Sequence, residues 1–407
     1  MMNNNYTCVF GGGAIRGLAY IGAMEALQEL EIICDKLVGS SVGAIFAALY
    51  SLGYTPSETK DIMYDFNAFM FKDLNFGLGA DFALSKGDVF ENWIRENIEK
   101  KFYGEKYQKG ENPPVTFRDI DKDLYICSTD LSTNTQFIFS KSKTPDFEIA
   151  KSVRISACFP GLMKPVEYED KILVDGDLAK SLPLWKCYDE LITPDNRILE
   201  FRLEGCRECM NFKNIFDYFN AVYSTMSNFS TENIIKEYKN KDKIDYILID
   251  TKDVILLDFQ IPNEMKDNIS KNGYYTTMEY FTKTLVKKKK KILPLYKNIL
   301  EFLKQLKPLI KKGQVSAAKK ALTNFICEIT EDYKNIDFIY AEDLKKFKTA
   351  IFQDIKEQGL FSSKKITHTI EHSKVLQGLI EKCEQKISDI TEYIEKYQNY
   401  SKLKMDV

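Results

Sequence analysis

The apolar positions of the first fifty residues fall into short runs and longer helical patterns. Residues 6–10 form an apolar run that stops at glycine, which predicts a buried strand. The segment 18–30 carries apolar residues at helical spacing and predicts a helix. A second strand is expected at 36–39, followed after a sharp turn by a helix over 42–52. Strand, loop, helix, strand, turn and helix is the order found in a parallel α/β sheet.

Later apolar segments continue this pattern and then give way to helix. Strands are expected at 124–130, 135–140, 171–177, 198–203 and 245–250. The composition changes near residue 285, where a run of lysines at Lys287–Lys291 begins, and nearly all of the sequence after it has a helical pattern. We therefore expect an α/β domain at 1–285 and a helical region at 286–407.

The clearest periodicity lies near the C-terminal end. Seven residues there are spaced alternately four and three apart, as in a heptad seam: Leu376, Ile380, Cys383, Ile387, Ile390, Ile394 and Tyr397. One interpretation is a coiled coil or partner-binding surface, through which residues 286–407 self-associate or recruit a protein. The other is a helix that folds back on the chain's own helices.

Composition and charge indicate a globular protein that does not bind nucleic acid. The 407 residues are 44% hydrophobic and 29% charged, and the formal net charge is only −2. No apolar run reaches the roughly 18 residues of a transmembrane helix, and the N-terminus lacks the basic and apolar regions of a signal peptide. We expect a cytoplasmic protein with peripheral membrane contact, and export without a signal peptide stays an alternative.

The cysteines favour a reducing compartment over a disulfide framework, because their number is odd, nine, and their spacing irregular. Cys206 and Cys209 form one CxxC, but no second pair follows, so zinc is not expected there.

The only two histidines are His368 and His372. Their scarcity excludes any mechanism that needs a histidine within the first 367 residues, and any zinc site with three histidine ligands. The two match the H-x-x-E-H motif of inverted zincins, but they lie off the heptad seam. We therefore expect no metal site.

The strongest local motif is the G-x-S-x-G of Gly39, Ser41 and Gly43, between a predicted strand and a predicted helix. A nucleophile elbow needs that context, because its tight turn is strained and its glycines leave room for neighbouring chain. Ser41 would then lie at a helix N-terminus, where developing negative charge is stabilised. The alternative is an ordinary loop between strand and helix.

A glycine-rich loop, Gly11, Gly12 and Gly13, follows the first strand. It lacks both the Gly-Lys-Ser/Thr of a P-loop and the spacing of a dinucleotide loop. An oxyanion hole is the better interpretation, and it would lie beside Ser41 if the first two strands are neighbours. Arg16 would brace this loop or bind an anionic headgroup.

An acidic pair, Asp175 and Asp177, flanks Gly176 at the end of a predicted strand. Active sites of α/β proteins form at the carboxyl edge of the sheet. A serine nucleophile needs a base, and with no histidine nearby a carboxylate is the remaining candidate. Asp175 in hydrogen-bond contact with Ser41 would complete a two-residue unit. The alternative is a simple Asp-Gly turn.

Taken in order, the glycine loop, the G-x-S-x-G motif and the Asp175-Gly176 pair resemble the patatin-like phospholipase family. Segments 153–166, 130–134 and 255–275 are similar to other parts of that family, so the resemblance covers roughly residues 5–285.

This resemblance implies a three-layer α/β/α sandwich with a mainly parallel central sheet. It also implies a serine lipid acyl hydrolase of the phospholipase A or lysophospholipase type, with membrane lipid as substrate and with neither metal nor cofactor. Ser41 would be the nucleophile, Asp175 the base, and the amides of Gly11, Gly12 and Gly13 the oxyanion hole. Supporting positions are Arg16, Gly39, Gly43 and Gly176.

Two departures from the family pattern stand out. Asp177 replaces a common second glycine, and would either raise the pKa of the base or face solvent. Tyr20 stands where many bacterial members have histidine, and it is not part of the dyad.

Two segments are candidates for membrane contact: the lysine run and the aromatic-rich segment 66–84, which would form a lid or an interfacial loop. Their alternatives are a solvated helix face and core packing. A further functional alternative is a catalytically weak scaffold whose helical C-terminus binds a partner protein.

Overall fold

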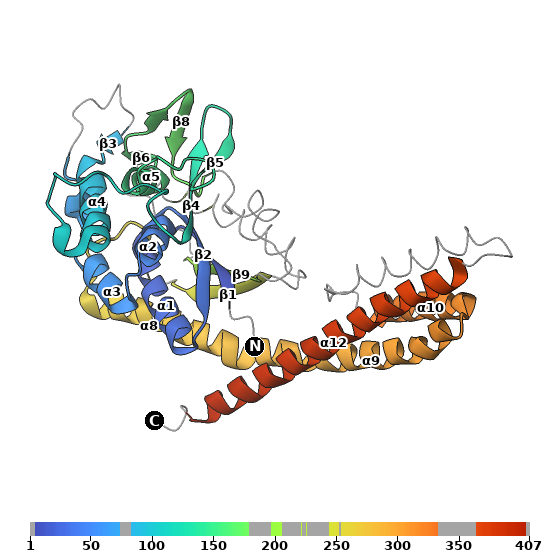
Figure 1. The fold of residues 1–407 in the computed structure, drawn as a ribbon. Helices are drawn as coiled ribbons and strands as arrows, with labels where there is room; N and C mark the ends of the chain where they lie inside the picture. Colours follow the sequence, from blue (N-terminus) through green and yellow to red (C-terminus); the bar gives the residue numbers. More distant parts are fainter. Residues whose placement is uncertain are drawn as a thin grey trace. The chain divides into compact units, whose positions relative to one another are not determined.

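The chain forms two compact units in this computed structural model (Figure 1). The structure describes residues 5–73, 83–178, 197–205, 244–251, 254–332 and 364–403, with the isolated positions 221 and 225. The first unit, here the α/β unit, contains the described residues up to Met278. The second, the helical unit, begins at Glu279, seven residues before the expected boundary.

The main sheet of the α/β unit is mostly parallel. Among the described residues its strands follow the order β10-β9-β1-β2-β4-β8-β7, and β5 also pairs with β4. The first five strands in this order run parallel, whereas β5, β7 and β8 are antiparallel to their neighbours. The strands are β1 (Asn5–Phe10), β2 (Ile33–Ser40), β4 (Asp123–Asp130), β5 (Thr135–Ser140), β7 (Val166–Tyr168), β8 (Lys171–Val174), β9 (Arg197–Glu204) and β10 (Ile244–Asp250).

Every strand predicted from an apolar run is present, and β1 and β2 are neighbours as expected. The last predicted residues of β8 are not strand, because the chain turns after Val174. Three strands were not predicted, namely β3 (Ala83–Ser85), β6 (Gly161–Met163) and β7. Each has only three residues, too few to show a period of two.

Helices cover the sheet and place the site-bearing loops. Those of the α/β unit are η1 (Ala14–Leu18), α1 (Ala19–Glu29), α2 (Val42–Ser51), α3 (Pro56–Tyr64), η2 (Ala68–Phe71), α4 (Asp88–Tyr103), η3 (Gly104–Lys106), α5 (Ile149–Ser156) and α8 (Asn263–Glu279). All residues of α2 are buried, and this helix packs on β1, β2 and β4.

Both faces of the sheet are buried, which agrees with the predicted layered α/β architecture. Phe10 lies on the face that α1 and α2 cover, in contact with Tyr20 and Tyr50. The neighbouring residue Val9 points the other way, into a second buried cluster with Val38, Cys127, Ile138, Ile198 and Ile244.

Helices α1 and α8 approach each other closely through two glycines. A Cβ added at Gly22 would lie 1.8 Å from the carbonyl oxygen of Ser270, and one added at Gly273 would lie 1.8 Å from that of Ala19. Only glycine therefore permits this backbone contact.

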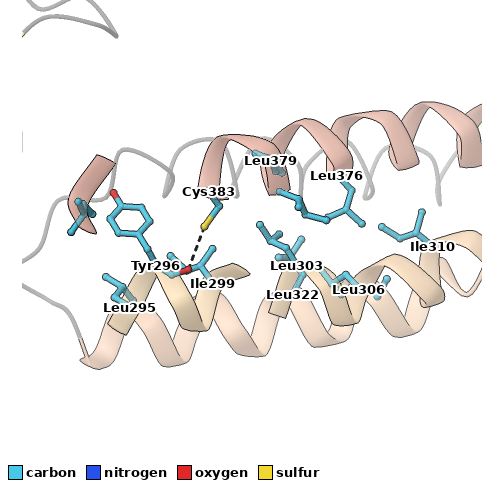
Figure 2. Packing of buried hydrophobic residues seen from close by; sticks show 13 residues of the cluster. Leu295, Tyr296, Ile299, Leu303, Leu306, Ile310, Leu322, Leu376, Leu379 and Cys383 are labelled. Carbon is cyan, nitrogen blue, oxygen red and sulfur yellow. Dashed lines mark hydrogen bonds between the residues drawn. The ribbon is translucent and has the colours of Figure 1, made fainter. Parts of the chain in front are cut away.

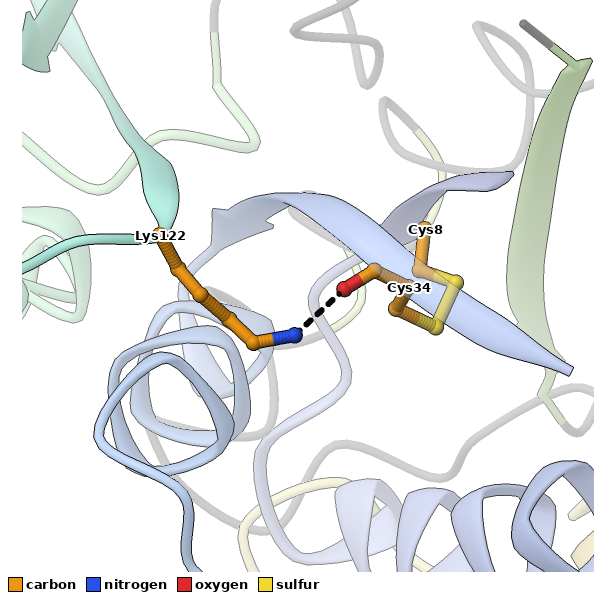
Figure 3. Close-up of a disulfide and its surroundings, with 3 residues drawn as sticks. All are labelled: Cys8, Cys34 and Lys122. Atoms are coloured by element: carbon orange, nitrogen blue, oxygen red, sulfur yellow. Dashed lines mark hydrogen bonds between the residues drawn. A yellow bond between two sulfur atoms is a disulfide. The ribbon is translucent and has the colours of Figure 1, made fainter. Parts of the chain in front are cut away.

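A disulfide joins Cys8 on β1 to Cys34 on β2, with 5.6 Å between the Cα atoms (Figure 3). The irregular cysteine spacing did not predict this pair, because the contact arises from the register of two parallel strands 26 residues apart in sequence. Among the described cysteines, Cys127, Cys158 and Cys383 are buried thiols, and Cys327 is an exposed thiol. The CxxC of Cys206 and Cys209 lies outside the described residues.

The helical unit confirms the all-helical pattern for its described residues: η4 (Tyr280–Thr284), α9 (Leu285–Lys311), α10 (Val315–Asp332) and α12 (Lys364–Leu403). The heptad seam of α12 packs on α9 within the chain (Figure 2). Leu376, Ile380 and Cys383 contact a cluster that includes Leu303, and the Cys383 thiol donates to the Tyr296 carbonyl at 3.3 Å. The fold-back interpretation of the seam is therefore confirmed.

The two histidines considered as metal ligands belong to the helical unit. His368 and His372 lie in α12, but their side chains fall outside the described ones. The described residues contain no group of histidine, cysteine and acidic side chains that could hold a metal ion. Within the same residues, no helix combines the length and apolar character needed to cross a bilayer.

Candidate active site

Ser41 occupies a strained turn between β2 and α2. Its backbone has φ 53° and ψ −126°, a left-handed conformation that side-chain-bearing residues rarely adopt. The flanking glycines make this turn possible. A Cβ at Gly39 would lie 2.4 Å from the Gly43 carbonyl oxygen, and one at Gly43 would lie 2.1 Å from that of Phe10. The G-x-S-x-G motif therefore has the geometry of a nucleophile elbow at the N-terminus of α2.

The hydroxyl of Ser41 contacts Asp175 directly. Its Oγ donates to Asp175 Oδ2 at 2.7 Å, and Asp175 is fully buried. The other carboxylate oxygen, Oδ1, accepts from the backbone N–H of Asp177 at 2.9 Å. The carboxylate is thus oriented from both sides, and a base within hydrogen-bond reach of a hydroxyl has the geometry for proton transfer.

Asp175 reaches this position by a route that the sequence argument did not foresee. The strand before Asp175 is β8, which runs antiparallel to β4. The rule that places strand ends at the carboxyl edge of a parallel sheet therefore does not apply to β8. Instead, β8 pairs with β4 at Thr129 and Asp130, the last residues of that strand. The chain then turns inward, and a Cβ at Gly176 would meet the Ser40 hydroxyl at 2.5 Å.

Ser156, at the C-terminal end of α5, was missed by the sequence analysis. Its hydroxyl accepts from the Ser41 N–H at 3.0 Å and donates to the Cys127 carbonyl at 2.5 Å. Its own carbonyl accepts from the Gly176 N–H at 3.1 Å. Ser156 therefore ties the backbones of the serine turn and the aspartate turn together. The sequence pointed to this region only through the similarity of segment 153–166 to the patatin-like phospholipase family, and that similarity assigned no role to Ser156.

The glycine loop lies beside the serine, but only part of it is available as predicted. The Gly11 N–H donates to the Phe201 carbonyl at 3.4 Å and continues the pairing of β1 with β9. The Gly11 N–H is therefore engaged in the sheet, and the prediction that it donates in the oxyanion hole is wrong. Within the part of the chain that the structure describes, the N–H groups of Gly12 and Gly13 donate to no protein acceptor. A Cβ at Gly12 would lie 3.0 Å from Cβ of Ser41, so Gly12 borders the serine turn.

Arg16 lies in η1, directly after the glycine loop, and its side chain contacts the chain near residues 205 and 254. Its side chain is buried, and Nε donates to the Val254 carbonyl at 2.8 Å. It also fills the space next to Gly205, where a Cβ would lie 2.2 Å from a guanidinium nitrogen.

A buried charged group lies behind the glycine loop. Asp177 does not face solvent, because it is 4% exposed and would contact a Cβ at Gly12. Arg202 borders Gly11 and forms a buried ion pair with Glu200. Burial lowers the pKa of Arg202, but the charges of Glu200 and Asp177 outweigh it and hold that pKa above its usual value.

An apolar cavity of about 50 Å³ opens beside Ser41. Its walls combine five aromatic side chains with aliphatic ones, and the lining residues are Ala14, Ile15, Ser41, Val42, Ile45, Met63, Phe66, Phe71, Phe90, Ala157, Phe159, Leu162, Met163, Leu257 and Phe259. Among these described residues the only polar side chain is that of Ser41, so the cavity suits an apolar group whose reactive end stops at Ser41.

The two segments considered for membrane contact differ in the structure. Phe66 and Phe71 line the cavity, which fits the core-packing alternative, whereas Phe69 between them is 73% exposed. Residues 74–82 lie outside the described part. Four of the five lysines at Lys287–Lys291 are exposed on α9, in the helical unit.

Comparisons with known proteins agree with this geometry. Residues 8–187 match the family model described as patatin-like phospholipase. YqhO of Bacillus subtilis (strain 168) is 26% identical over 281 residues, which cover 63% of this chain and 91% of YqhO. The protein named "Probable lipid hydrolase 463L" of Invertebrate iridescent virus 6 is 28% identical over 182 residues, 44% of this chain and 61% of its own length.

Among solved structures, VipD from Legionella pneumophila is similar with a TM-score of 0.50 and 18% identity, over 96% of this chain and 91% of that chain. At this identity the likeness concerns the fold alone. Together with the match of the family model and the sheet order, it leads to one conclusion. The α/β unit has the patatin fold, and residues 8–187 match the patatin-like phospholipase family.

Proposed function

We propose that this chain hydrolyses fatty-acyl esters of lipids, as a phospholipase A or lysophospholipase, through a dyad of Ser41 and Asp175. The observation that carries the proposal is the 2.7 Å contact between the serine hydroxyl and the buried carboxylate, at the mouth of an apolar cavity. The family match supports the reaction class, and the cavity supports a lipid substrate.

In the first half of the reaction, Ser41 Oγ attacks the ester carbonyl carbon while its proton moves to Asp175 Oδ2. The carbonyl oxygen becomes an oxyanion, which the N–H groups of Gly12 and Gly13 stabilise, each such donor contributing about 3 kcal/mol. The bond to the alcohol then breaks, and the alcohol oxygen takes the proton from Asp175. An acyl-enzyme on Ser41 and a free lysophospholipid or deacylated glycerophosphodiester result.

In the second half, Asp175 accepts a proton from water, and the resulting hydroxide attacks the acyl-enzyme. A second oxyanion forms in the same place. When it collapses, Ser41 Oγ leaves and recovers its proton from Asp175, and a fatty acid is released. The base in both halves is a carboxylate, since the chain's two histidines both lie beyond residue 367.

The acyl chain occupies the aromatic cavity in this proposal. Phe66, Phe71, Phe90 and Phe259 surround it, and burying a hydrocarbon chain among them contributes about 0.8 kcal/mol for each methylene removed from water. The exposed ring of Phe69, next to these walls in sequence, is our candidate for contact with the lipid surface that supplies the substrate.

The proposal is tested by lipid hydrolysis with mass-spectrometric readout across phospholipids, lysophospholipids, galactolipids and triglycerides. Wild type is compared with Ser41→Ala and Asp175→Asn, and a fluorophosphonate probe reports whether Ser41 is reactive. We expect release of free fatty acid and probe labelling by wild type, and loss of both in Ser41→Ala.

Two outcomes contradict the proposal. Activity near that of wild type in Asp175→Asn, with the fold intact by circular dichroism, would contradict the dyad. No hydrolysis and no labelling of wild type would favour the alternative of a silent scaffold. As a control, replacing both His368 and His372 by alanine should leave hydrolysis unchanged.

A further inference from the structure

We infer that Tyr20 is a positioning residue for the oxyanion hole, because its hydroxyl holds the peptide group that carries the Gly12 N–H. Tyr20 OH donates to the Gly11 carbonyl oxygen at 2.9 Å, and both groups are buried. Tyr20 lies on α1 and has no place in the dyad. The inference rests on the proposed acyl-transfer function and names one residue on which that function depends.

The argument begins with the geometry of one peptide group. The carbonyl of Gly11 and the N–H of Gly12 belong to the same planar peptide, and no described peptide bond is cis. In a trans peptide the C=O and N–H bonds point in opposite directions. A hydroxyl that fixes the Gly11 oxygen on the α1 side therefore aims the Gly12 N–H away from α1, in a loop whose Gly12 borders Ser41.

Without this bond the loop has other conformations available. Three consecutive glycines have little intrinsic preference for one backbone conformation, so neighbouring groups must select it. The Gly11 oxygen is confined on a second side by Gly43, where a Cβ would lie 2.7 Å from it. A hydrogen bond to the carbonyl also polarises the peptide and strengthens the N–H as a donor.

The position of the Tyr20 ring is itself well determined. The ring lies edge-on to Phe10, Phe46 and Phe201, at centroid distances of 5.2, 5.4 and 6.4 Å. Helix α1 is held close to α8 by the contact between Ala19 and Gly273. The hydroxyl is therefore delivered to the carbonyl by a rigid support, as positioning of a donor group requires.

The hydroxyl also remains a donor over the whole working pH range. Burial raises the pKa of Tyr20 far above its usual value, and the carboxylates of Asp177 and Glu200 raise it further, against the opposing charge of Arg202. A phenolate could only accept a hydrogen bond, and this side chain stays neutral.

The test is Tyr20→Phe, which removes the hydroxyl and keeps the ring. Its matched control is Tyr50→Phe, because Tyr50 contacts Phe10 and Phe46 in the same buried cluster, while its hydroxyl lies against Thr59 and not against the glycine loop. For each full-length variant we would measure kcat and KM on a water-soluble acyl ester, and the inhibition constant of an acyl trifluoromethyl ketone. Ser41 Oγ adds to the carbonyl carbon of that ketone, and the ketone oxygen becomes an anion in the oxyanion hole.

We expect Tyr20→Phe to lower kcat on the order of tenfold to a hundredfold with KM unchanged, less than the 10²–10³ lost when a donor itself is removed. The affinity for the ketone should fall by the same factor, since both depend on the oxyanion. Tyr50→Phe should change neither by more than about twofold. A general loss of stability in Tyr20→Phe would not link kcat to ketone binding.

The outcomes separate this inference from the function on which it rests. An active wild type whose Tyr20→Phe variant keeps its kcat and ketone affinity within twofold overturns the inference alone. A raised KM with kcat retained also overturns it, because a positioned oxyanion donor acts on the transition state. A wild type that neither hydrolyses esters nor binds the ketone overturns the proposed function, and the inference with it.

Discussion

The two units use glycine in opposite ways. Around the serine turn, Gly39 and Gly43 stand where any Cβ would overlap a neighbouring backbone, so the position of Ser41 depends on backbone atoms in direct contact. In the helical unit, Gly378 lies inside α12 with open space around it, and the fold depends on side chains along a heptad seam. The site therefore tolerates almost no added volume, whereas the helices tolerate changes away from the seam.

The largest expected effect comes from Gly43→Ala. Its Cβ would lie 2.1 Å from the Phe10 carbonyl oxygen, so the turn and the glycine loop must move apart. We expect a loss on the order of 4 kcal/mol in the free energy of unfolding and a loss of hydrolysis below one hundredth of wild type. Chemical denaturation and ester hydrolysis measure these effects.

The control for that variant is Gly378→Ala. Because nothing surrounds this helical glycine, alanine should stabilise α12 by up to about 1 kcal/mol. Equal tolerance of alanine at both positions would remove the contrast between the two units.

The next largest effect is expected for Leu303→Ala, on the face of α9 that packs against the seam of α12. Leu303 is 1% exposed and packs in the cluster with Leu376 and Leu379 on α12, so its truncation should cost about 2–5 kcal/mol. Leu300 is only partly buried beside the same cluster, and Leu300→Ala should cost clearly less. Thermal unfolding followed by circular dichroism compares the two, and equal losses would mean that the seam does not stabilise this unit.

The disulfide between Cys8 and Cys34 should contribute about 3 kcal/mol, because it closes a loop of 26 residues in the unfolded chain. We expect Cys34→Ser, or a reductant, to lower the denaturation midpoint, with no further effect of reductant on the variant. Helices of the second unit contain no described disulfide, so their unfolding should not respond. Two reactive thiols at these positions in the oxidised native protein would contradict the pairing.

The sequence predicts those features of both units that depend on local patterns. Apolar runs predicted β1, β2 and β9 within a residue or so at their C-terminal ends, because local periodicity determines a buried strand. The motif at Ser41 predicted a strained turn, because the glycines on both sides of the serine are close to it in sequence and leave room for the neighbouring chain. The heptad spacing predicted the seam of α12 but not its partner, because a seam on α9 and a seam on a second chain have the same pattern.

What the sequence could not provide are contacts between distant segments. Ser156 lies 115 residues from the amide it accepts from, and no local pattern marks it. Asp175 was predicted in the right place for an incomplete reason, because the direction of β8 depends on the turn that follows β7. The Gly11 amide was assigned to the oxyanion hole because the sequence does not show that β9 pairs with it.

The smallest expected effect compares an exposed ion pair in each unit. In the helical unit, Lys304 and Glu384 meet at 2.7 Å between two half-exposed side chains. In the α/β unit, Glu58 meets Lys101 at 2.7 Å and also accepts from the Thr55 N–H at 2.7 Å, which caps α3. We expect Glu384→Gln to have almost no effect and Glu58→Gln to cost somewhat more, still under about 1 kcal/mol.

The pH dependence distinguishes the two pairs further. The hydrogen bond from Lys101, followed by that from the Thr55 N–H, lowers the pKa of Glu58 from 4.5 to about 2. A carboxylate with a depressed pKa stabilises the fold above the unfolded value and loses that contribution as the pH falls through the folded one. The difference in unfolding free energy between wild type and Glu58→Gln should therefore be constant above about pH 5 and shrink between pH 4.5 and 2. A difference that stays the same down to pH 2.5 would mean that the cap of α3 depends on Thr55 alone, and that surface charge contributes as little in the α/β unit as it does on α12.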